Sequence, residues 1–308
     1  MKIIKKILFA LILNFTLSIY SKVLIFTFSY NRPDFIEIQY KTLKKFLKDD
    51  YEFVVFNDAP DLSENEKSIT NMCKKLNIKH IRIPQNIHSK PYLKRWPGED
   101  YNHPTIRCCN VIQYSLNTYG FNHDDIVLLL DSDIFLIREF SIQEFLKNYD
   151  IVSFPQQKAN NNFIITQLSV HLTFLNMPFL HNRNNMDFNC GKVFDVPVDA
   201  GGQTYFYLRN NPDLRIYYLN NQNIKEFYCE NCFNLNKNLC NHNTVLLKQL
   251  NFSENEINFI QSGPENIDFL FNKRFLHYRS GSNWNNQSEE YHRKKTNLLN
   301  NFINNILT

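Results

Sequence analysis

The chain has 308 residues, of which 43% are hydrophobic and 15% aromatic, so it can form a substantial core and is not intrinsically disordered. Its 7 glycines and 11 prolines exclude a collagen-like or linker-like chain. Lys and Arg number 34 against 30 Asp and Glu, and the net charge of +4 is too even to identify a nucleic-acid-binding protein.

Residues 1–21 differ in composition from the rest of the chain. Lys2, Lys5 and Lys6 precede a mostly apolar run from Ile7 to Tyr20. A basic start followed by about 14 such positions is typical of a signal peptide, whereas a membrane-spanning helix needs about 20. A cleaved signal peptide and an uncleaved anchor both stay open, so we expect the protein to be exported or membrane-associated.

The next segment alternates predicted strands and helices. Three runs rich in β-branched and aromatic residues are predicted as strands, and the segments between them carry apolar residues at helical spacing. The strands are Val23–Phe28, Tyr51–Phe56 and Ile78–Ile83, and the helices begin near Pro33 and Ser63. Short joints between these elements favour a parallel sheet covered by helices.

A second helix-strand unit follows, and the remainder is less regular. The pattern predicts a helix over Thr105–Tyr119 and then the most apolar strand of the chain, Asp125–Leu130. Further strands are predicted at 150–154, 172–176, 186–190, 214–219 and 275–278, with helices at 141–146, 199–210 and 287–307. No internal repeat and no Gly/Ser or Pro linker divides the chain.

Two carboxylates, Asp131 and Asp133, come directly after the apolar strand. Open parallel sheets bind ligands beyond the carboxyl ends of their strands, and residues i and i+2 of an extended segment point the same way. Like charges held together need neutralising, and Mg²⁺ or Mn²⁺ does this while leaving positions for substrate phosphates. A solvated turn is the alternative, but the apolar runs on both sides favour a metal site.

This layout resembles a GT-A glycosyltransferase over roughly Lys22 to Trp284. The firmest motif is DIVLLLDSD, ending at Asp133, and SYNRP after the first strand supports it. The resemblance implies a Rossmann-like, mostly parallel α/β sheet flanked by helices, with a nucleotide half of about 22–137 and an elaborated acceptor half of about 138–308 in a single domain.

The same resemblance implies a function. The chain would move a sugar from a nucleotide-sugar donor to a hydroxyl of a glycan, lipid or protein acceptor, with Mn²⁺ or Mg²⁺ as cofactor. Asp133 would be the more direct metal ligand, and Asp131 would contact ribose or metal. A secreted carbohydrate-binding protein and a nucleotidyltransferase are the rivals, and the lack of glycine in FSYNRPDF argues against the second.

Five further residues gain a nucleotide-side role from the resemblance. Ser29, Tyr30 and Asn31 follow the first strand, where the family places base and ribose contacts. Asp58 ends the second strand, where a carboxylate often meets the base, although it also suits an Asx turn. Arg107 would lie near the phosphates, for which a guanidinium is suited, or else in a surface ion pair.

The late segment Phe275–Trp284 is similar to the His-x-x-Gly…Trp stretch of some retaining GT-A enzymes. By that similarity His277 would be a third metal ligand and Arg279 would offset diphosphate charge. This sequence departs from the pattern, because three residues separate His277 from Gly281 and no Lys-Pro precedes Trp284. A strand histidine with no metal role is the alternative.

Asp187 and Asp199 are the candidates for a catalytic base, because an inverting transferase needs a carboxylate to deprotonate the acceptor hydroxyl. Asp199 precedes Gly201 and Gly202, a pair that would let the backbone approach a sugar closely. Helix capping is the alternative for Asp199, since Asp is a good N-cap residue.

A cysteine cluster carries a separate prediction. Cys229 and Cys232 have the spacing of half a zinc site, but Cys240 and His242 are too close to complete it in the usual way. In an exported protein Cys229 and Cys232 would instead pair with each other or with Cys240, so zinc, a disulfide and plain thiols all stay open.

Overall fold

The computed structural model describes residues 22–89, 103–159, 163–223, 241–262, 267–281 and 288–308. The predicted leader 1–21, the cysteines at 229, 232 and 240, and Trp284 lie outside these residues, and the predictions about them stay predictions. Within the described ranges, every helix is too short or too polar to cross a bilayer.

A seven-stranded sheet with the order β10-β6-β7-β4-β1-β2-β3 forms the centre of the molecule. All its neighbours pair in parallel except β7, which runs antiparallel to β4 and β6. The strands are β1 (Val23–Ser29), β2 (Tyr51–Asn57), β3 (Lys79–Arg82), β4 (Ile126–Leu130), β6 (Ile151–Ala159), β7 (Ile164–Asn176) and β10 (Ile216–Tyr218).

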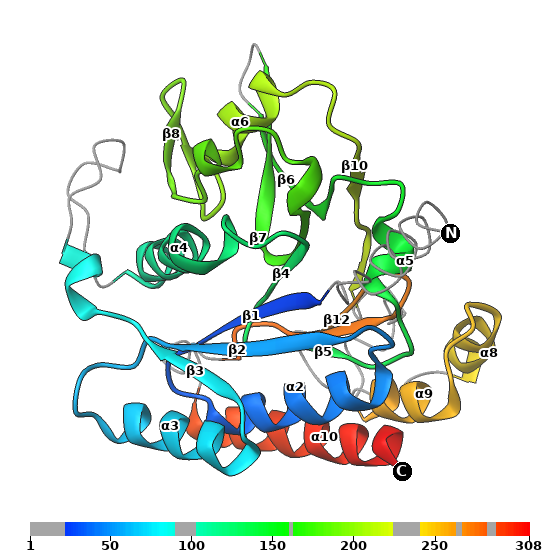
Figure 1. Cartoon of the computed structure of the whole chain (residues 1–308). Coiled ribbons are helices and arrows are strands. Elements are labelled where there is room, and N and C mark those ends of the chain that lie inside the picture. Colours follow the sequence, from blue (N-terminus) through cyan, green and yellow to red (C-terminus); the bar gives the residue numbers. More distant parts are fainter. Residues whose placement is uncertain (1–21, 90–102, 160–162, 224–240, 263–266, 282–287) are drawn as a thin grey trace, which may run out of the picture.

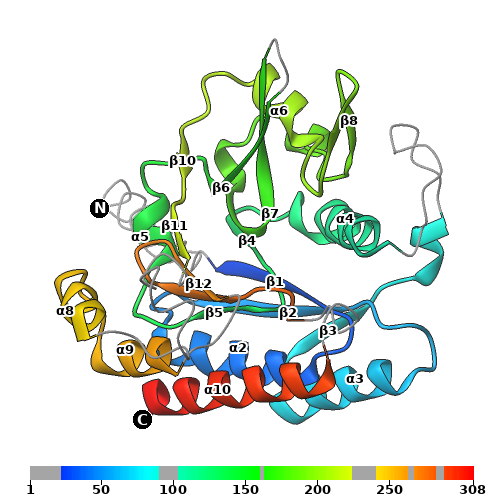
Figure 2. The same ribbon diagram turned by 180° about the vertical axis from the view of Figure 1, so that it is seen from behind.

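Helices cover both faces of this sheet. Helices α2 (Pro33–Phe46), α3 (Glu64–Leu76) and α10 (Glu289–Leu307) lie on one side, and α4 (Pro104–Ser115) lies on the other (Figures 1 and 2). Pro33 opens α2, and Ser63 Oγ caps α3 by accepting from the N–H of Glu66 at 3.1 Å. Because β1 and β4 have a helix layer on both sides, their apolar runs are buried. The predicted α/β class is confirmed.

A second, antiparallel sheet has the order β11-β12-β13-β5. Its strands are β5 (Ile134–Leu136), β11 (Asn221–Asn223), β12 (Ile267–Leu270) and β13 (Phe275–Tyr278). The chain leaves β4 of the large sheet and enters β5 of the small sheet through Asp131-Ser132-Asp133. The carboxylate pair therefore lies at the junction of the two sheets.

The remaining elements lie around these sheets. They are the hairpin of β8 (Gly191–Val193) and β9 (Val196–Val198), and the helices α5 (Ile142–Leu146), α6 (Thr204–Asn210), α8 (Asn241–Gln249) and α9 (Glu254–Gln261). Short 3₁₀ turns occupy Gln85–Ser89, Met177–Phe179 and Arg183–Asn185, and a π-helical turn, Leu116–Gly120, continues α4.

The predicted strand at 186–190 is wrong. The Phe188 N–H donates to Gln113 Oε1 at 2.8 Å, and the Cys190 N–H points at Cys109 Sγ at 3.2 Å. Side chains of α4, and not a neighbouring strand, thus satisfy this backbone.

The predicted helix at 199–210 begins later than expected, because turns occupy the residues before α6. Gly201 has φ +84°, and a Cβ on it would lie 2.1 Å from the carbonyl oxygen of Leu168. The glycine therefore permits close approach to strand β7, and the expected approach to a sugar stays a prediction.

Candidate functional site

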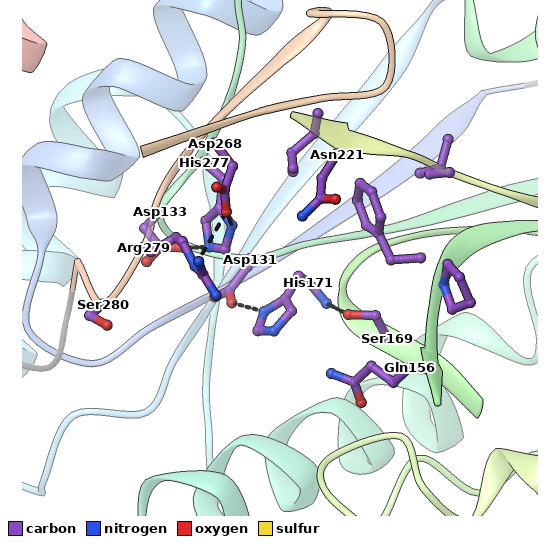
Figure 3. A pocket seen from close by; sticks show the side chains of 14 residues that line it. Asp131, Asp133, Gln156, Ser169, His171, Asn221, Asp268, His277, Arg279 and Ser280 are labelled. Carbon is purple, nitrogen blue, oxygen red and sulfur yellow. Dashed lines mark hydrogen bonds and ion pairs between the residues drawn. The ribbon is translucent and has the colours of Figure 1, made fainter. Parts of the chain in front are cut away.

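A pocket of about 590 Å³ opens where the two sheets meet, and Figure 3 shows the side chains that line it. Its charged side is formed by Asp131, Asp133, Asp268, His277 and Arg279. Its other side includes Phe154, Gln156, Ser169, Leu219 and Asn221 and is uncharged apart from His171. Four of the sequence-predicted site residues, Asp131, Asp133, His277 and Arg279, thus come together in one pocket.

Asp131 and Asp133 occupy a turn and not the extended segment that the sequence predicts. The Ile134 N–H donates to the carbonyl of Asp131 at 3.1 Å, which closes the turn. Both carboxylates still line the pocket, because the turn carries the chain from one sheet to the other at this point.

Asp133 is the deeper of the two carboxylates. It is 5% exposed, and its Oδ2 accepts from the Gly281 N–H at 2.9 Å. Its Oδ1 is buried, has no hydrogen-bond partner, and lies 3.4 Å from His277 Nε2. The pairing of β13 with β5 explains this contact, since His277 lies opposite Ile134, the residue after Asp133.

The charge state of Asp133 follows from these neighbours. Burial favours the neutral acid, but the charge of His277, the hydrogen bond from the Gly281 N–H and the charge of His171 together lower the pKa of Asp133 below its ordinary value. Asp133 is therefore a carboxylate at neutral pH, as a cation ligand must be.

Gly281 and Arg32 fix the position of Asp133. Arg32 is 3% exposed and donates from Nη1 to the carbonyl of Gly281 at 2.7 Å, while Gly281 donates its N–H to Asp133. A Cβ on Gly281 would lie 2.6 Å from Phe35 Cε2 and 2.8 Å from Asp133 Cβ. Only glycine fits here without displacing its neighbours.

Asp131 is held by a partner that the sequence reasoning missed. Its Oδ2 lies 2.8 Å from His171 Nδ1, and its Oδ1 accepts from the Ser132 N–H at 2.7 Å. Burial lowers the pKa of His171, but the hydrogen bond and charge of Asp131, with the charges of Asp133 and Asp199, raise it overall. His171 thus carries positive charge to a higher pH than an ordinary histidine.

An irregularity in β7 brings His171 into the pocket. The register of β6 and β7 shifts between Ser153 and Pro155, and four residues of β7, 169–172, fall within the shift. The His171 N–H donates to Ser169 Oγ at 3.2 Å, and both side chains line the pocket. Such bulges often redirect a side chain near an active site. The only sequence signal was a histidine within an apolar run.

Asp268 is the second residue that the sequence reasoning missed. It lies on β12, is 2% exposed, and its Oδ2 is 3.3 Å from Arg279 Nε and 3.8 Å from His277 Nδ1. Its signal was a lone acid in the apolar run IDFLF, and nothing in the sequence indicates that this run pairs with the strand of His277.

Asp58 and Arg107 form a separate cluster at the carboxyl end of β2. Asp58 accepts from Arg107 Nη2 at 2.9 Å, and its other oxygen lies 2.7 Å from His88 Nε2. Arg107 also lies 5.2 Å from the ring of Tyr30, measured from Cζ to the centroid. Asp58 and Arg107 are thus paired with each other, and neither lines the pocket.

Ser29, Tyr30 and Asn31 also lie outside the pocket lining. Ser29 is buried at the end of β1, and Tyr30 is 39% exposed. These residues and Asp58 follow parallel strands at the same edge of the sheet as Asp131. Their nucleotide-binding roles stay predictions.

The two candidate bases do not line the pocket either. Asp187 Oδ1 accepts from the backbone N–H and side-chain amide of Asn189, at 2.8 and 2.6 Å. Asp199 is exposed, its Oδ1 accepts from the Ala200 N–H at 2.8 Å, and its charge reaches His171. Asp199 therefore acts electrostatically on His171, a residue of the pocket, although it does not line the pocket itself.

A divalent cation would fit between two of the pocket residues. Among the described residues no group of three His, Cys, Asp or Glu side chains is arranged to hold a metal. Asp133 Oδ1 and His277 Nε2, however, are 3.4 Å apart, and two adjacent ligands of an octahedral cation lie about 3 Å apart. Mg²⁺ commonly takes only one or two protein ligands, with water and substrate phosphates completing the shell.

No protein-family model matches the chain, and no curated protein matches its sequence. Solved structures similar to it include glycosyltransferases, the class that the sequence resembles. One is the bifunctional WbbM, at 10% identity over 65% of this chain and 39% of that one. The mannosyltransferase PcManGT from Pyrobaculum calidifontis, solved with GDP-Man and Mn²⁺, is 13% identical over 65% and 55%.

The galactosyltransferase LgtC, solved with donor and acceptor sugar analogues, is 13% identical over 64% of this chain and 72% of that one. The TM-score is 0.39 in each of these three cases. The chain spans less than two thirds of WbbM and of PcManGT. At this level the likenesses lend no support to a particular activity, and the proposal below is drawn from the pocket.

Proposed function

We propose that the protein is a metal-dependent glycosyltransferase that moves a sugar from a nucleotide-sugar donor to an acceptor hydroxyl. The proposal rests chiefly on one contact. Asp133 keeps a buried carboxylate oxygen without a hydrogen bond, 3.4 Å from His277 Nε2, and both residues line a pocket of about 590 Å³.

The charged side of the pocket suits the donor. Asp133 and His277 would hold Mn²⁺ or Mg²⁺, which when bound supplies positive charge against the diphosphate leaving group. Arg279 is half-exposed at the same side, so its guanidinium can meet phosphate oxygens. Asp131, oriented by His171, would contact the ribose or the metal.

The uncharged side of the pocket suits the transferred sugar and the acceptor hydroxyl. Gln167, which is fully buried, donates to Gln156 Oε1 at 2.6 Å and so leaves the Gln156 amide N–H groups for the pocket. Asp199 is the better candidate for the base, because its charge reaches the histidine beside Asp131. A glycan, a lipid or a protein would supply the hydroxyl.

A donor screen tests this function. Nucleotide-sugars are incubated with the full chain, and release of nucleoside diphosphate is followed with Mn²⁺, with Mg²⁺ and with EDTA. We expect turnover only with metal, and a loss of at least about 100-fold in Asp133→Asn. Asp195→Asn, on the exposed tip of the β8–β9 hairpin, is the matched control and should keep full activity.

Two outcomes would refute the proposal. Full activity of Asp133→Asn would show that its carboxylate does not hold the cofactor. Release of pyrophosphate from a nucleoside triphosphate, with no release of diphosphate from any nucleotide-sugar, would identify a nucleotidyltransferase.

A further inference from the structure

A third carboxylate, Asp268, has no part in the function proposed so far. It faces His277 across the small sheet, since the two residues are directly paired in the register of β12 and β13. Cross-strand partners stand side by side on one face of a sheet. Asp268 is 2% exposed, so this pairing places a charged group in the interior next to His277.

The two ring nitrogens of His277 face two different carboxylates, as Figure 3 shows. Nε2 lies 3.4 Å from Asp133 Oδ1, and Nδ1 lies 3.8 Å from Asp268 Oδ2. The His277 side chain is only 12% exposed, so the protein and not solvent fixes its orientation. The imidazole thus lies between an acid at the pocket and an acid behind it.

This order of groups is the one that metal-binding histidines use. A histidine that binds a metal through one nitrogen usually donates the N–H of the other to a carboxylate or carbonyl, which fixes tautomer and ring orientation. We propose that Asp268 is a positioning residue for a divalent cation site: its carboxylate lies 3.8 Å from His277 Nδ1, would accept from that nitrogen when the cation is bound, and so holds Nε2 toward Asp133. This inference rests on the proposed function.

Arg279 offers a competing explanation of the same acid. Its Nε lies 3.3 Å from Asp268 Oδ2, so Asp268 would serve only to anchor this arginine. The Arg279 side chain is 49% exposed, however, and ion pairs with exposed partners contribute little. The two explanations differ in what Mn²⁺ binding does when Arg279 is removed.

Mn²⁺ binding to the full chain without nucleotide tests the inference, with free Mn²⁺ measured by electron paramagnetic resonance. We expect Asp268→Asn to weaken Mn²⁺ binding by about 10- to 100-fold and Asp195→Asn to leave it unchanged. Arg279→Gln should bind as wild type does. Pulsed electron paramagnetic resonance should detect an imidazole nitrogen bound directly to Mn²⁺ in wild type, and this signal should be absent in His277→Gln.

Several results would overturn the inference. The first is equal Mn²⁺ affinity in Asp268→Asn and wild type. The second is recovery of Mn²⁺ affinity in the double variant Asp268→Asn/Arg279→Gln, because that recovery would show that Asp268 acts through Arg279. If Asp133→Asn and His277→Gln weaken Mn²⁺ binding and Asp268→Asn does not, this inference fails alone. If wild type and Asp133→Asn bind Mn²⁺ equally poorly, the proposed function fails with it.

A measurement on the wild-type protein covers the case in which Asp268→Asn does not fold. Nitrogen NMR of ¹⁵N-histidine protein, with the His277 signal assigned by its loss in His277→Gln, reports which ring nitrogen carries the proton. With diamagnetic Mg²⁺ bound, we expect the ring proton on Nδ1, because Nε2 would face the cation. A proton on Nε2 would contradict the inference.

Discussion

At the residue scale, the position of Asp133 depends on a glycine that makes no contact of its own with the pocket. Gly281 accepts from Arg32 through its carbonyl and donates to Asp133 through its N–H. It lies against Phe35 and Tyr278 with no room for a side chain. The strand that ends at Tyr278 therefore delivers both His277 and the hydrogen bond that orients Asp133.

Gly281→Ala should disrupt this arrangement. The added methyl group would overlap Phe35 and the Asp133 side chain, so we expect a loss of about 1–3 kcal/mol in unfolding free energy and weaker Mn²⁺ binding. Urea unfolding checks the first effect. Ser280→Gly is the control, because Ser280 has φ +61° and glycine accepts that conformation readily. An alanine variant as stable as wild type would contradict the packing described.

At the element scale, the side chain of Asp150 adds to the backbone pairing that joins the edge strand β10 to β6. Asp150 immediately precedes β6, and its Oδ2 accepts from the Arg215 backbone N–H at 2.9 Å, while its Oδ1 accepts from Arg215 Nη2 at 2.5 Å. Arg215 immediately precedes β10. The pair therefore sets the point at which the short parallel strand joins the sheet.

The Asp150 contact predicts a specific pH dependence of stability. Burial raises the pKa of Asp150, but the hydrogen bonds and charge of Arg215 lower it overall from 3.8. A lowered folded-state pKa stabilises the fold above the unfolded value, and this contribution is lost as the pH falls through the folded value. Asp150→Asn should thus be less stable than wild type at pH 7, and the difference should shrink below about pH 4.

Urea midpoints at pH 7, 5 and 3 measure this difference. Asp213→Asn, an exposed acid two residues before Arg215, is the matched control and should follow wild type at every pH. A gap between Asp150→Asn and wild type that is constant down to pH 3 would show that the contact does not depend on the charge of Asp150.

Gly201 packs the turn before α6 against β7 at Leu168, beyond the part of β7 that pairs with β4. With φ +84° and only 2.1 Å between a built Cβ and the Leu168 carbonyl oxygen, Gly201→Ala would push the turn off the strand. We expect a loss of about 2 kcal/mol or more, since the obstacle is backbone and cannot move aside as a side chain can. A variant with the wild-type unfolding midpoint would refute this account.

Sequence patterns predicted the local elements well and the non-local contacts poorly. The predicted strands at 23–28 and 51–56 and the helix that begins near Pro33 lie close to their observed bounds, because apolar runs and start signals are local properties. By contrast, β7 begins at Ile164, eight residues earlier than predicted, and β8, β9, β11 and β12 were not predicted at all.

The same distinction separates the site residues. Asp131 and Asp133 were identifiable because a single apolar strand leads into them. His171 and Asp268 reach the pocket through the pairing of β7 with β4 and of β12 with β13, which no single segment reveals. Asp58 and Arg107 contact each other across 49 residues of sequence, which no local pattern predicts, and their nucleotide-side roles stay predictions.

At the scale of the whole molecule, the two sheets contribute different groups to the pocket, and the turn between them brings these groups together. The large sheet ends at Asp131, and the small sheet, through β13, adds His277 and Arg279 beside Asp133. Neither sheet alone carries a complete set of groups for a cation and a diphosphate. Ligand binding should therefore depend on both sheets being folded together.

The central claim is that Asp133 holds a metal ion against a nucleoside diphosphate. Isothermal titration calorimetry with nucleoside diphosphates tests this claim most directly. With the full chain, we predict that at least one nucleoside diphosphate binds in the presence of Mn²⁺, that binding is lost with EDTA, and that it is lost in Asp133→Asn but not in Asp195→Asn. Binding of a free sugar with no diphosphate binding under any metal condition, or diphosphate binding that persists in Asp133→Asn, would contradict the account.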